Sequence, residues 1–189
     1  MKKLILVASV LFAAVSFAQN TYHADPAHSR IQFKVSHLTV ADVTGNFDKF
    51  DLAVQASDVS FADAKLTFSA QVNSINTHVE ARDNHLKSAD FFDAEKYPTL
   101  NFVSTSIKKK GKNKFVVNGN LTLHGVTKPV AVLLENRGTT VNPMNKKSVS
   151  GLRVTTVIKR SDFNIGGDFP TAVIGDEVQI QGDFEVGTK

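Results

Sequence analysis

The 189-residue chain contains no cysteine and no tryptophan. The absence of cysteine excludes disulfide bonds, thiolate-bound metals and thiol-linked lipid anchors, so packing alone must hold the fold together. Long apolar runs are also lacking, apart from residues 4–17. The net charge is small, because the chain has 22 Lys and Arg and 18 Asp and Glu. This small net charge excludes nucleic acid as an expected partner.

The N-terminus has the pattern of an export signal. Lys2 and Lys3 precede the apolar run, and Ser16 and Ala18 are small residues suited to a cleavage site. The run is shorter than the ~20 residues that a membrane-spanning helix needs. We therefore predict a signal peptide at residues 1–18 and a single mature domain at residues 19–189. The predicted localisation is the periplasm, with secretion as the alternative.

Most of the mature sequence alternates apolar and polar residues with a period of two. Residues 65–73 and 177–186 show this pattern most clearly. Such alternation is typical of antiparallel strands with one face in water. We predict about eight strands, at residues 31–37, 45–54 with a bend after Phe47, 65–75, 100–107, 115–124, 129–135, 149–158 and 177–186.

Two segments depart from this alternation. Residues 79–92 carry apolar side chains at spacings of three and four, which predicts a short helix lying over one end of the sheet. Residues 161–176 are rich in glycine and are expected to be irregular at the same end. An all-β chain with so little helix must cover its apolar face by sheet packing or by closure, so the pattern favours a barrel or a sandwich.

Phenylalanine dominates the large apolar residues. The chain has 14, of which Phe12 and Phe17 lie in the predicted signal, so 12 remain beside only two tyrosines. Phenylalanine buries a large apolar surface without a polar atom. This composition suits an interior that holds a hydrocarbon, and it equally suits an ordinary filled core.

Six sequence blocks occur in a distinctive order: Asp25–His37, Gly45–Phe47, Ser74–Thr77, Arg82–Asp93 with Tyr97–Pro98, Gly119–Val130, and Arg160–Phe163. Through them the chain resembles the YceI-like, or polyisoprenoid-binding, family of periplasmic proteins over nearly the whole mature sequence. The resemblance implies an extended, lipocalin-like antiparallel β-barrel of about eight strands with one short helix near its mouth. It also implies an elongated apolar cavity that binds a long isoprenoid. Tyr22 and Asn164 depart from the common Trp and Gly of relatives, which puts the local shape near the opening in doubt.

The candidate head-group ligands at the mouth are Arg82, Asp83 and His85, with His28 and Arg160 as further candidates. Arg82 and His85 share one face of the predicted helix, and a guanidinium with an imidazole can meet a phosphate or a quinone oxygen. The alternative is structural: Arg82 and Asp83 hold the helix across the barrel, and His28 and Arg160 fix turns.

The candidate lining residues of the cavity are taken from the apolar positions of the alternating strands, whose side chains point to the interior. The small residues Ala70 and Gly182 are expected to leave room for a channel. The predicted lining residues are Phe33, Val35, Phe68, Ala70, Val72, Phe102, Leu121, Val154, Ile180 and Gly182.

The predicted function is non-enzymatic binding, storage or transport of a long-chain apolar lipid, such as a polyisoprenoid, an isoprenoid quinone or a fatty amphiphile, without a cofactor or metal. The alternative is a periplasmic metal-binding or stress-related adaptor protein with a filled barrel. No Gly-x-Ser-x-Gly motif indicates a hydrolase, and the six histidines lack the short spacings of metal ligands. The sequence leaves open both a homodimer and a transient contact with a membrane surface. The lysines of residues 108–114 suit either that surface or a solvated hairpin loop.

Overall fold

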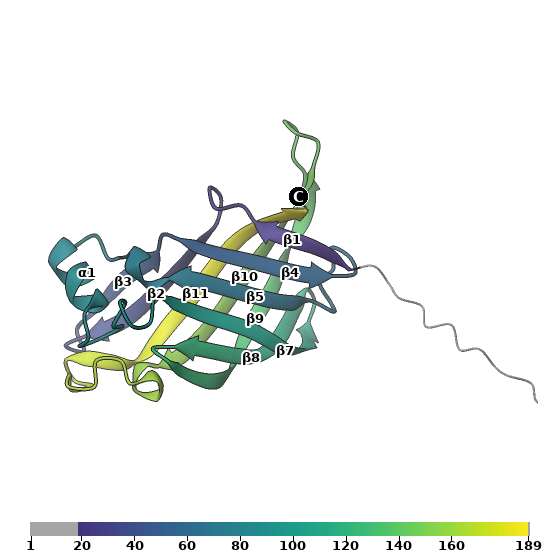
Figure 1. Ribbon diagram of the computed structural model, residues 1–189. Coiled ribbons are helices and arrows are strands. Elements are labelled where there is room, and N and C mark those ends of the chain that lie inside the picture. The colour runs from purple at the N-terminus through teal and green to yellow at the C-terminus, as the bar shows by residue number, and fades with distance from the viewer. Residues whose placement is uncertain (1–18, 189) are drawn as a thin grey trace, which may run out of the picture.

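Hydrogen-bonded strands make up most of residues 19–188, which are the residues that the computed structural model describes. The predicted signal peptide lies outside them. The strands form one antiparallel sheet that closes on itself, because β1 pairs with both β4 and β11 (Figure 1). Their bounds are β1 Asn20–Ala24, β2 Arg30–His37, β3 Ala41–Phe47, β4 Phe50–Ala56, β5 Lys65–Gln71, β6 Ile75–Asn76, β7 Thr99–Gly111, β8 Lys114–Leu123, β9 Val126–Val141, β10 Ser148–Lys159 and β11 Ile174–Thr188.

Six of the shorter strands are arranged end to end in three pairs, and each pair occupies one strand position in the wall of the barrel, as one long strand would. β1 and β2 lie end to end along β11, β4 and β3 lie along β1 and β2, and β5 and β6 lie along β4 and β3. The wall therefore has eight strand positions, which confirms the predicted antiparallel barrel. The strand expected at residues 45–54 is the end of β3 and the start of β4, separated at the expected bend.

The breaks in these long strands lie side by side. Asp48 and Lys49 separate β3 from β4, and the 3-10 helix η1 (Val72–Ser74) separates β5 from β6. The Asp48 N–H donates to the Ser74 carbonyl at 3.0 Å, and the Lys49 N–H donates to Ser74 Oγ at 3.0 Å. In the third break, at residues 25–29, the Asp25 N–H donates to the Glu185 carbonyl at 2.8 Å. The breaks are thus fixed by hydrogen bonds.

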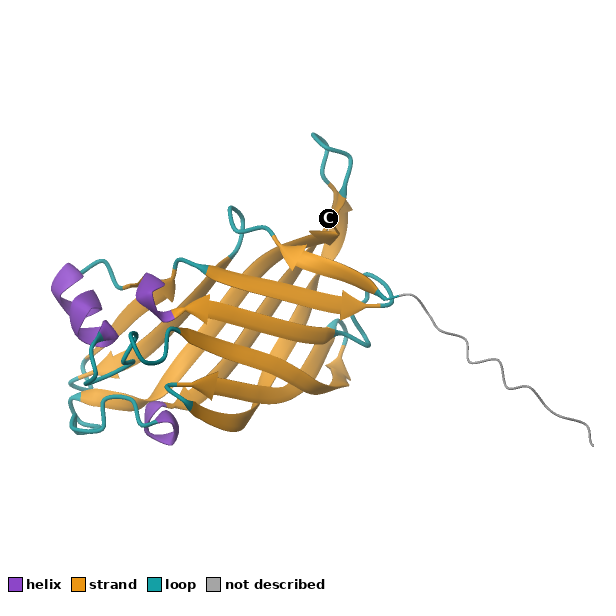
Figure 2. Cartoon of the chain, in the orientation of Figure 1, coloured by secondary structure: helices purple, strands orange, loops and turns teal. Residues whose placement is uncertain are grey.

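The helix α1 (Glu80–Lys87) lies at one end of the barrel, as predicted, and not along its wall (Figure 2). It is shorter than residues 79–92, because Ser88 leaves the helical conformation and its Oγ donates to the His85 carbonyl at 2.8 Å. A second 3-10 helix, η2 (Arg160–Phe163), begins the irregular segment that precedes β11. No helix within residues 19–188 is both long enough and apolar enough to cross a membrane.

The half of the barrel farther from α1 is filled by side chains. Val54, Phe61, Val117, Leu134 and Val186 all have exposed fractions of 0%. The Phe61 ring meets the Tyr22 ring edge to face, with centroids 5.0 Å apart. This packed half gives the barrel a solid base, and the half nearer α1 differs from it.

Candidate ligand cavity

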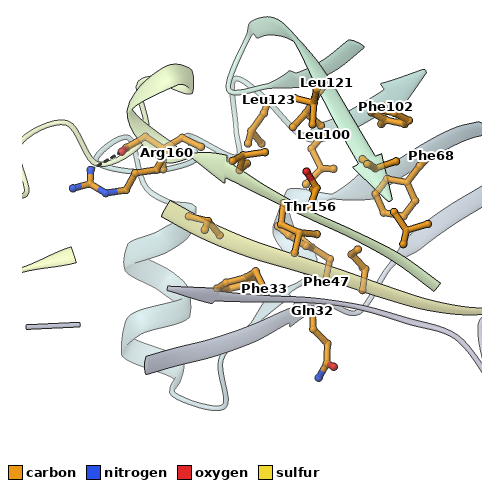
Figure 3. A pocket seen from close by; sticks show the side chains of 18 of the residues that line it. Gln32, Phe33, Phe47, Phe68, Leu100, Phe102, Leu121, Leu123, Thr156 and Arg160 are labelled. Carbon is orange, nitrogen blue, oxygen red and sulfur yellow. Dashed lines mark hydrogen bonds between the residues drawn. The ribbon is translucent and has the colours of Figure 1, made fainter. Parts of the chain in front are cut away.

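The half of the barrel nearer α1 encloses a cavity of about 180 Å³ that is partly open to solvent. The wall surface is apolar, although Gln32, Thr156 and Arg160 also border the cavity. Figure 3 shows Phe33 and Phe47 facing Leu121 and Phe102 across it. Side chains from every long strand and from both capping segments contribute. The lining includes Ile31, Phe33, Val35, Phe47, Leu52, Leu66, Phe68, Leu86, Phe91, Phe92, Leu100, Phe102, Leu121, Leu123, Val130, Val132, Val154, Thr156, Ile158, Arg160, Ile165, Ile174, Val178, Ile180 and Phe184.

Three aromatic rings form the floor between the cavity and the packed half. The Phe68 and Phe184 centroids are 6.2 Å apart, and Phe50 lies 5.8 Å from Phe184 and 6.2 Å from Phe68. Phe68 and Phe184 line the cavity, and the partly buried Phe50 packs against both rings. The cavity therefore occupies only part of the length of the barrel.

Glycines in the wall explain why the aromatic rings leave space inside. A Cβ atom at Gly45 would collide with the Phe33 ring, and one at Gly119 would collide with the Phe102 ring. Each ring thus lies against a wall position that has no side chain, on the neighbouring strand. A ring held against the wall in this way does not fill the centre.

Two segments cover the end of the cavity. The helical cap segment (residues 77–98) contributes Phe91, and the loop cap segment (residues 160–175) contributes Phe169. Their rings stack with centroids 4.9 Å apart, and the His85 ring contacts both edge to face at 5.0 and 5.8 Å. The two segments meet through these three rings above the cavity.

Arg160 holds the loop cap segment together from inside. Its side chain is buried, and all five guanidinium N–H groups donate to backbone carbonyls at 2.5–3.2 Å. No N–H group is left for a ligand, since arginine has only five. The stem of Arg160 lines the cavity, and its guanidinium braces the loop (Figure 3). The role of Arg160 as a head-group ligand stays a prediction. The acceptors are the carbonyls of Ile165, Gly166, Phe169, Ile174 and Gly175.

The other polar residues predicted at the mouth are also engaged with protein groups. Arg82 donates to the Thr77 side chain at 2.8 Å and to the Thr77 carbonyl at 3.0 Å. Asp83 accepts from the Thr77 N–H at 2.8 Å. His85 Nε2 lies 2.9 Å from Asp90 Oδ2. The structure thus brings Arg82, Asp83 and His85 together in one cap segment. There they connect the helix α1 to the residues just before it and just after it.

His28 lies apart from the cavity. It occupies the break between β1 and β2, where its Nδ1 lies 2.8 Å from Asp25 Oδ2 and Glu185 is nearby. The hydrogen bond to Asp25 and the charge of Asp25 raise the pKa of His28. The same hydrogen bond and the N–H of Ala27 lower the pKa of Asp25. Among the described residues these three are the one group with metal-ligand spacing. No spacing in the sequence indicates this grouping, because Glu185 is on the last strand.

Seven of the ten predicted lining residues border the cavity. Ala70 does not, because it packs in the wall between Phe50 and Leu100. Val72 is buried in η1, beyond the end of β5. Gly182 does not line the cavity, because the ring of Phe184, which does line it, lies over the position where the Gly182 side chain would be. The seven are Phe33, Val35, Phe68, Phe102, Leu121, Val154 and Ile180.

The wall is incompletely hydrogen-bonded beside the cavity. The ladder between β9 and β10 ends at Leu133 and Thr155, although both strands continue toward the capped end. Across this seam, defined by residues 126–132 and 156–159, Thr156 Oγ1 donates to the Ala131 carbonyl at 2.9 Å. Pro129, which has no N–H, is typical of such an edge. The seam is therefore bridged by a side-chain hydrogen bond, whereas backbone hydrogen bonds join β9 and β10 elsewhere.

The fold and the cavity define a class: closed antiparallel barrels that enclose an apolar ligand space. The family model described as "YceI-like domain" matches residues 22–186. The chain belongs to this family.

Related sequences and structures agree with this assignment. A UPF0312 protein of Staphylococcus aureus (strain USA300) is 36% identical over 165 residues, which cover 85% of this chain and 94% of the relative. The crystal structure of Burkholderia cenocepacia BcnA is similar with a TM-score of 0.78 and 28% identity, covering 87% of this chain and 99% of that one. The YceI protein of Campylobacter jejuni is similar with a TM-score of 0.74 and 31% identity, covering 82% and 91%. A polyisoprenoid-binding domain of Saccharophagus degradans shares the fold, with a TM-score of 0.65 and 18% identity over 89% of this chain and 98% of that one.

Proposed function

We propose that the protein is a non-enzymatic carrier or store of a long apolar lipid, which it holds by one end in the cavity. The observation that supports this proposal most directly is an apolar space in a barrel that is otherwise close-packed. Unfilled space of this kind costs stability, because the side chains around it lose packing contacts. A chain molecule would restore those contacts. The polyisoprenoid-binding domain that shares the fold supports an isoprenoid ligand.

The size of the cavity restricts how the ligand binds. At about 180 Å³ it is smaller than the roughly 300–1000 Å³ of common ligand pockets. A slender chain of a few isoprene units matches it better than a branched or fused-ring molecule. We infer that the remaining length and the head group stay at the capped end or outside, where Arg82, His85 and Arg160 are already engaged with protein groups. Affinity then comes from the hydrocarbon, at ~25 cal/mol per Å² of buried apolar area.

The alternative function, an adaptor with a filled barrel, fits the interior less well because only the half away from α1 is filled. We also propose that the protein works in the periplasm after export, where a water-insoluble lipid needs a carrier between membranes. The Lys2–Lys3 pair and the apolar residues that follow support this location.

A chain-length series tests the proposal. Geraniol, farnesol and geranylgeraniol are titrated into delipidated protein while displacement of a fluorescent fatty acid is followed. Affinity is expected to rise at least about tenfold from geraniol to farnesol, because each buried CH₂ contributes ~0.8 kcal/mol. Affinity that is absent or independent of chain length would overturn the proposal.

Two substitutions on β10 provide a matched pair. Val154 lines the cavity, whereas Val157 lies on the outer face with 54% of its surface exposed. Val154→Phe is expected to fill the cavity and weaken farnesol binding at least about tenfold, while an added side chain in a cavity costs little stability. Val157→Phe should bind as the wild type does. Equal binding by both variants would show that the cavity is not the site.

A further inference from the structure

The hairpin between β2 and β3 ends in exposed apolar side chains. Leu38 and Val40 have exposed fractions of 51% and 84%. The Leu38 N–H donates to the Val173 carbonyl at 2.9 Å, which places the hairpin beside residues 170–173 of the loop cap segment. Residues 36–41 of the hairpin contain no Lys, Arg, Asp or Glu, and neither do residues 170–173 of the loop cap segment. We call residues 38–40 and 170–173 the apolar tip.

The backbone of the apolar tip is strained. Leu38 and Thr39 have φ angles of 51° and 61°, in the left-handed region that favours glycine and asparagine. Phe61 has a similar φ of 57°, but its side chain is fully buried and packing compensates for the strain. Leu38 lacks that compensation because half of its surface is exposed. An exposed, strained leucine indicates a contact that the isolated protein does not make.

The apolar tip lies at the cavity end of the barrel. His37 pairs with Ile174, and both Ile174 and Val35 line the cavity. The hairpin between β9 and β10, which carries the exposed Met144, projects from the end opposite α1 (Figure 1). The lysine-rich β7–β8 hairpin joins the wall at the packed half, near Phe115. The capped end is thus apolar at its tip, and the lysine-rich hairpin lies away from it.

We propose that the apolar tip docks the protein on the surface of a lipid bilayer, with the capped end facing the membrane. The choice of a bilayer rests on the proposed function, because a water-insoluble chain must pass directly between the membrane and the cavity. A protein partner needs about 800 Å² on each side, more than two projecting side chains and a short loop offer. A bilayer interface accepts single apolar side chains, and an uncharged tip enters it without a desolvation penalty for charge.

The absence of tryptophan allows a direct test of which end meets the membrane. Val40→Trp places the only indole of the chain in the apolar tip, and Met144→Trp places it on an equally exposed side chain at the other end. With phosphatidylcholine vesicles, the emission of the Val40→Trp variant is expected to shift to shorter wavelength as the indole leaves water. The Met144→Trp variant should show no shift. A shift in the second variant alone would overturn the proposal.

Vesicle binding by charged variants measures the contribution of the apolar tip. Val40→Asp is expected to lower partitioning into phosphatidylcholine vesicles at least about tenfold. Val141→Asp is the matched control, because Val141 has an exposed fraction of 58% in the hairpin at the other end. Farnesol binding in solution should be unchanged in Val40→Asp, so a failure of docking is distinguished from a failure of the proposed function.

Three further outcomes would contradict docking by the apolar tip. The first is wild-type protein that does not bind vesicles. The second is binding that requires anionic lipid and is lost with salt or with Lys110→Glu, which would place the contact at the lysine-rich hairpin. The third is a dimer without vesicles that Val40→Asp converts to a monomer, which would assign the tip to a second copy of the chain.

Discussion

At the scale of the residue, the charged side chains predicted at the mouth of the barrel join parts of this protein to one another. Arg160 satisfies five carbonyls of one loop, and Arg82 and Asp83 both fix Thr77. A guanidinium suits this task because its five donors spread in a plane. The polar residues of the capped end therefore shape the cover of the cavity, and binding energy must come mainly from apolar contact.

Replacing Arg160 tests its role as a brace. Arg160→Lys keeps the charge but offers three donors to five carbonyls, so it should lower the free energy of unfolding by about 2–3 kcal/mol. The loop cap segment should also become more sensitive to proteases. The control is Arg137→Lys, since the Arg137 side chain is half exposed and its 3.5 Å ion pair with Asp183 is worth under about 1 kcal/mol. Equal losses in urea unfolding of both variants would contradict the brace.

Asp183 links stability to pH. Burial acts to raise its pKa, but hydrogen bonds from Arg153 at 2.6 Å and Gln181 at 2.8 Å, with the charges of Arg153 and Arg137, lower the pKa below its usual value. Because the folded state has the lower pKa, the stabilisation is present above the unfolded pKa and is lost as pH falls through the folded one. Asp183→Asn should cost about 2 kcal/mol at pH ~7 and less at pH ~3. Urea unfolding at both values measures this, with the exposed Asp168→Asn as control.

At the scale of the element, the seam between β9 and β10 is the weakest join in the wall beside the cavity. The backbone ladder stops at Leu133 and Thr155, and one threonine hydroxyl bridges the rest. Fewer backbone hydrogen bonds mean that opening costs less there than in a continuous ladder. We expect the seam to open during ligand exchange.

A cross-link tests the role of the seam, and the cysteine-free chain makes it unambiguous. Ala131→Cys with Val157→Cys joins the two edges, and its disulfide should slow the release of bound farnesol several-fold. Leu133→Cys with Thr155→Cys is the control, because these residues are already paired in the ladder. Release that is unchanged by the first disulfide would instead point to exchange between the two cap segments.

The elements also show what a sequence can and cannot predict. The period of two located most strands, since it reflects which face of each strand is buried. It could not place Ala70 and Gly182 relative to the cavity, because their surroundings depend on rings from other positions. The five acceptors of Arg160 and the grouping of His28 with Glu185 depend on segments that meet only in the folded barrel. Phe91 and Phe92 lie outside the strands, so alternation did not mark them as lining residues.

At the scale of the whole molecule, the two halves of the barrel differ, and the proposed function assigns stability to one and binding to the other. The packed half contains the fully buried side chains Val54, Val117 and Leu134, and the other half contains the cavity. Regions with fewer buried contacts open more readily than the global fold. The base should therefore keep its structure while the capped end fluctuates.

Hydrogen exchange measures this division. Amides of β4 and of residues 115–117 are expected to exchange more slowly than those of β2 and the loop cap segment. Farnesol should slow exchange mainly in the cavity half and raise the melting temperature, since a ligand that binds only the folded state stabilises it. Protection spread evenly over the barrel, or farnesol protection at the base, would contradict the division.

The aligned breaks of the three long strands have a mechanical consequence. Residues 25–29, 48–49 and 72–74 interrupt adjacent positions of the wall between its two halves. Although hydrogen bonds hold these breaks in register, the three strands are not continuous there, so we expect the wall to bend at them when a guest enters. The capped end would then widen while the base keeps its radius, and the volume of the empty cavity is a lower bound on what the barrel can hold.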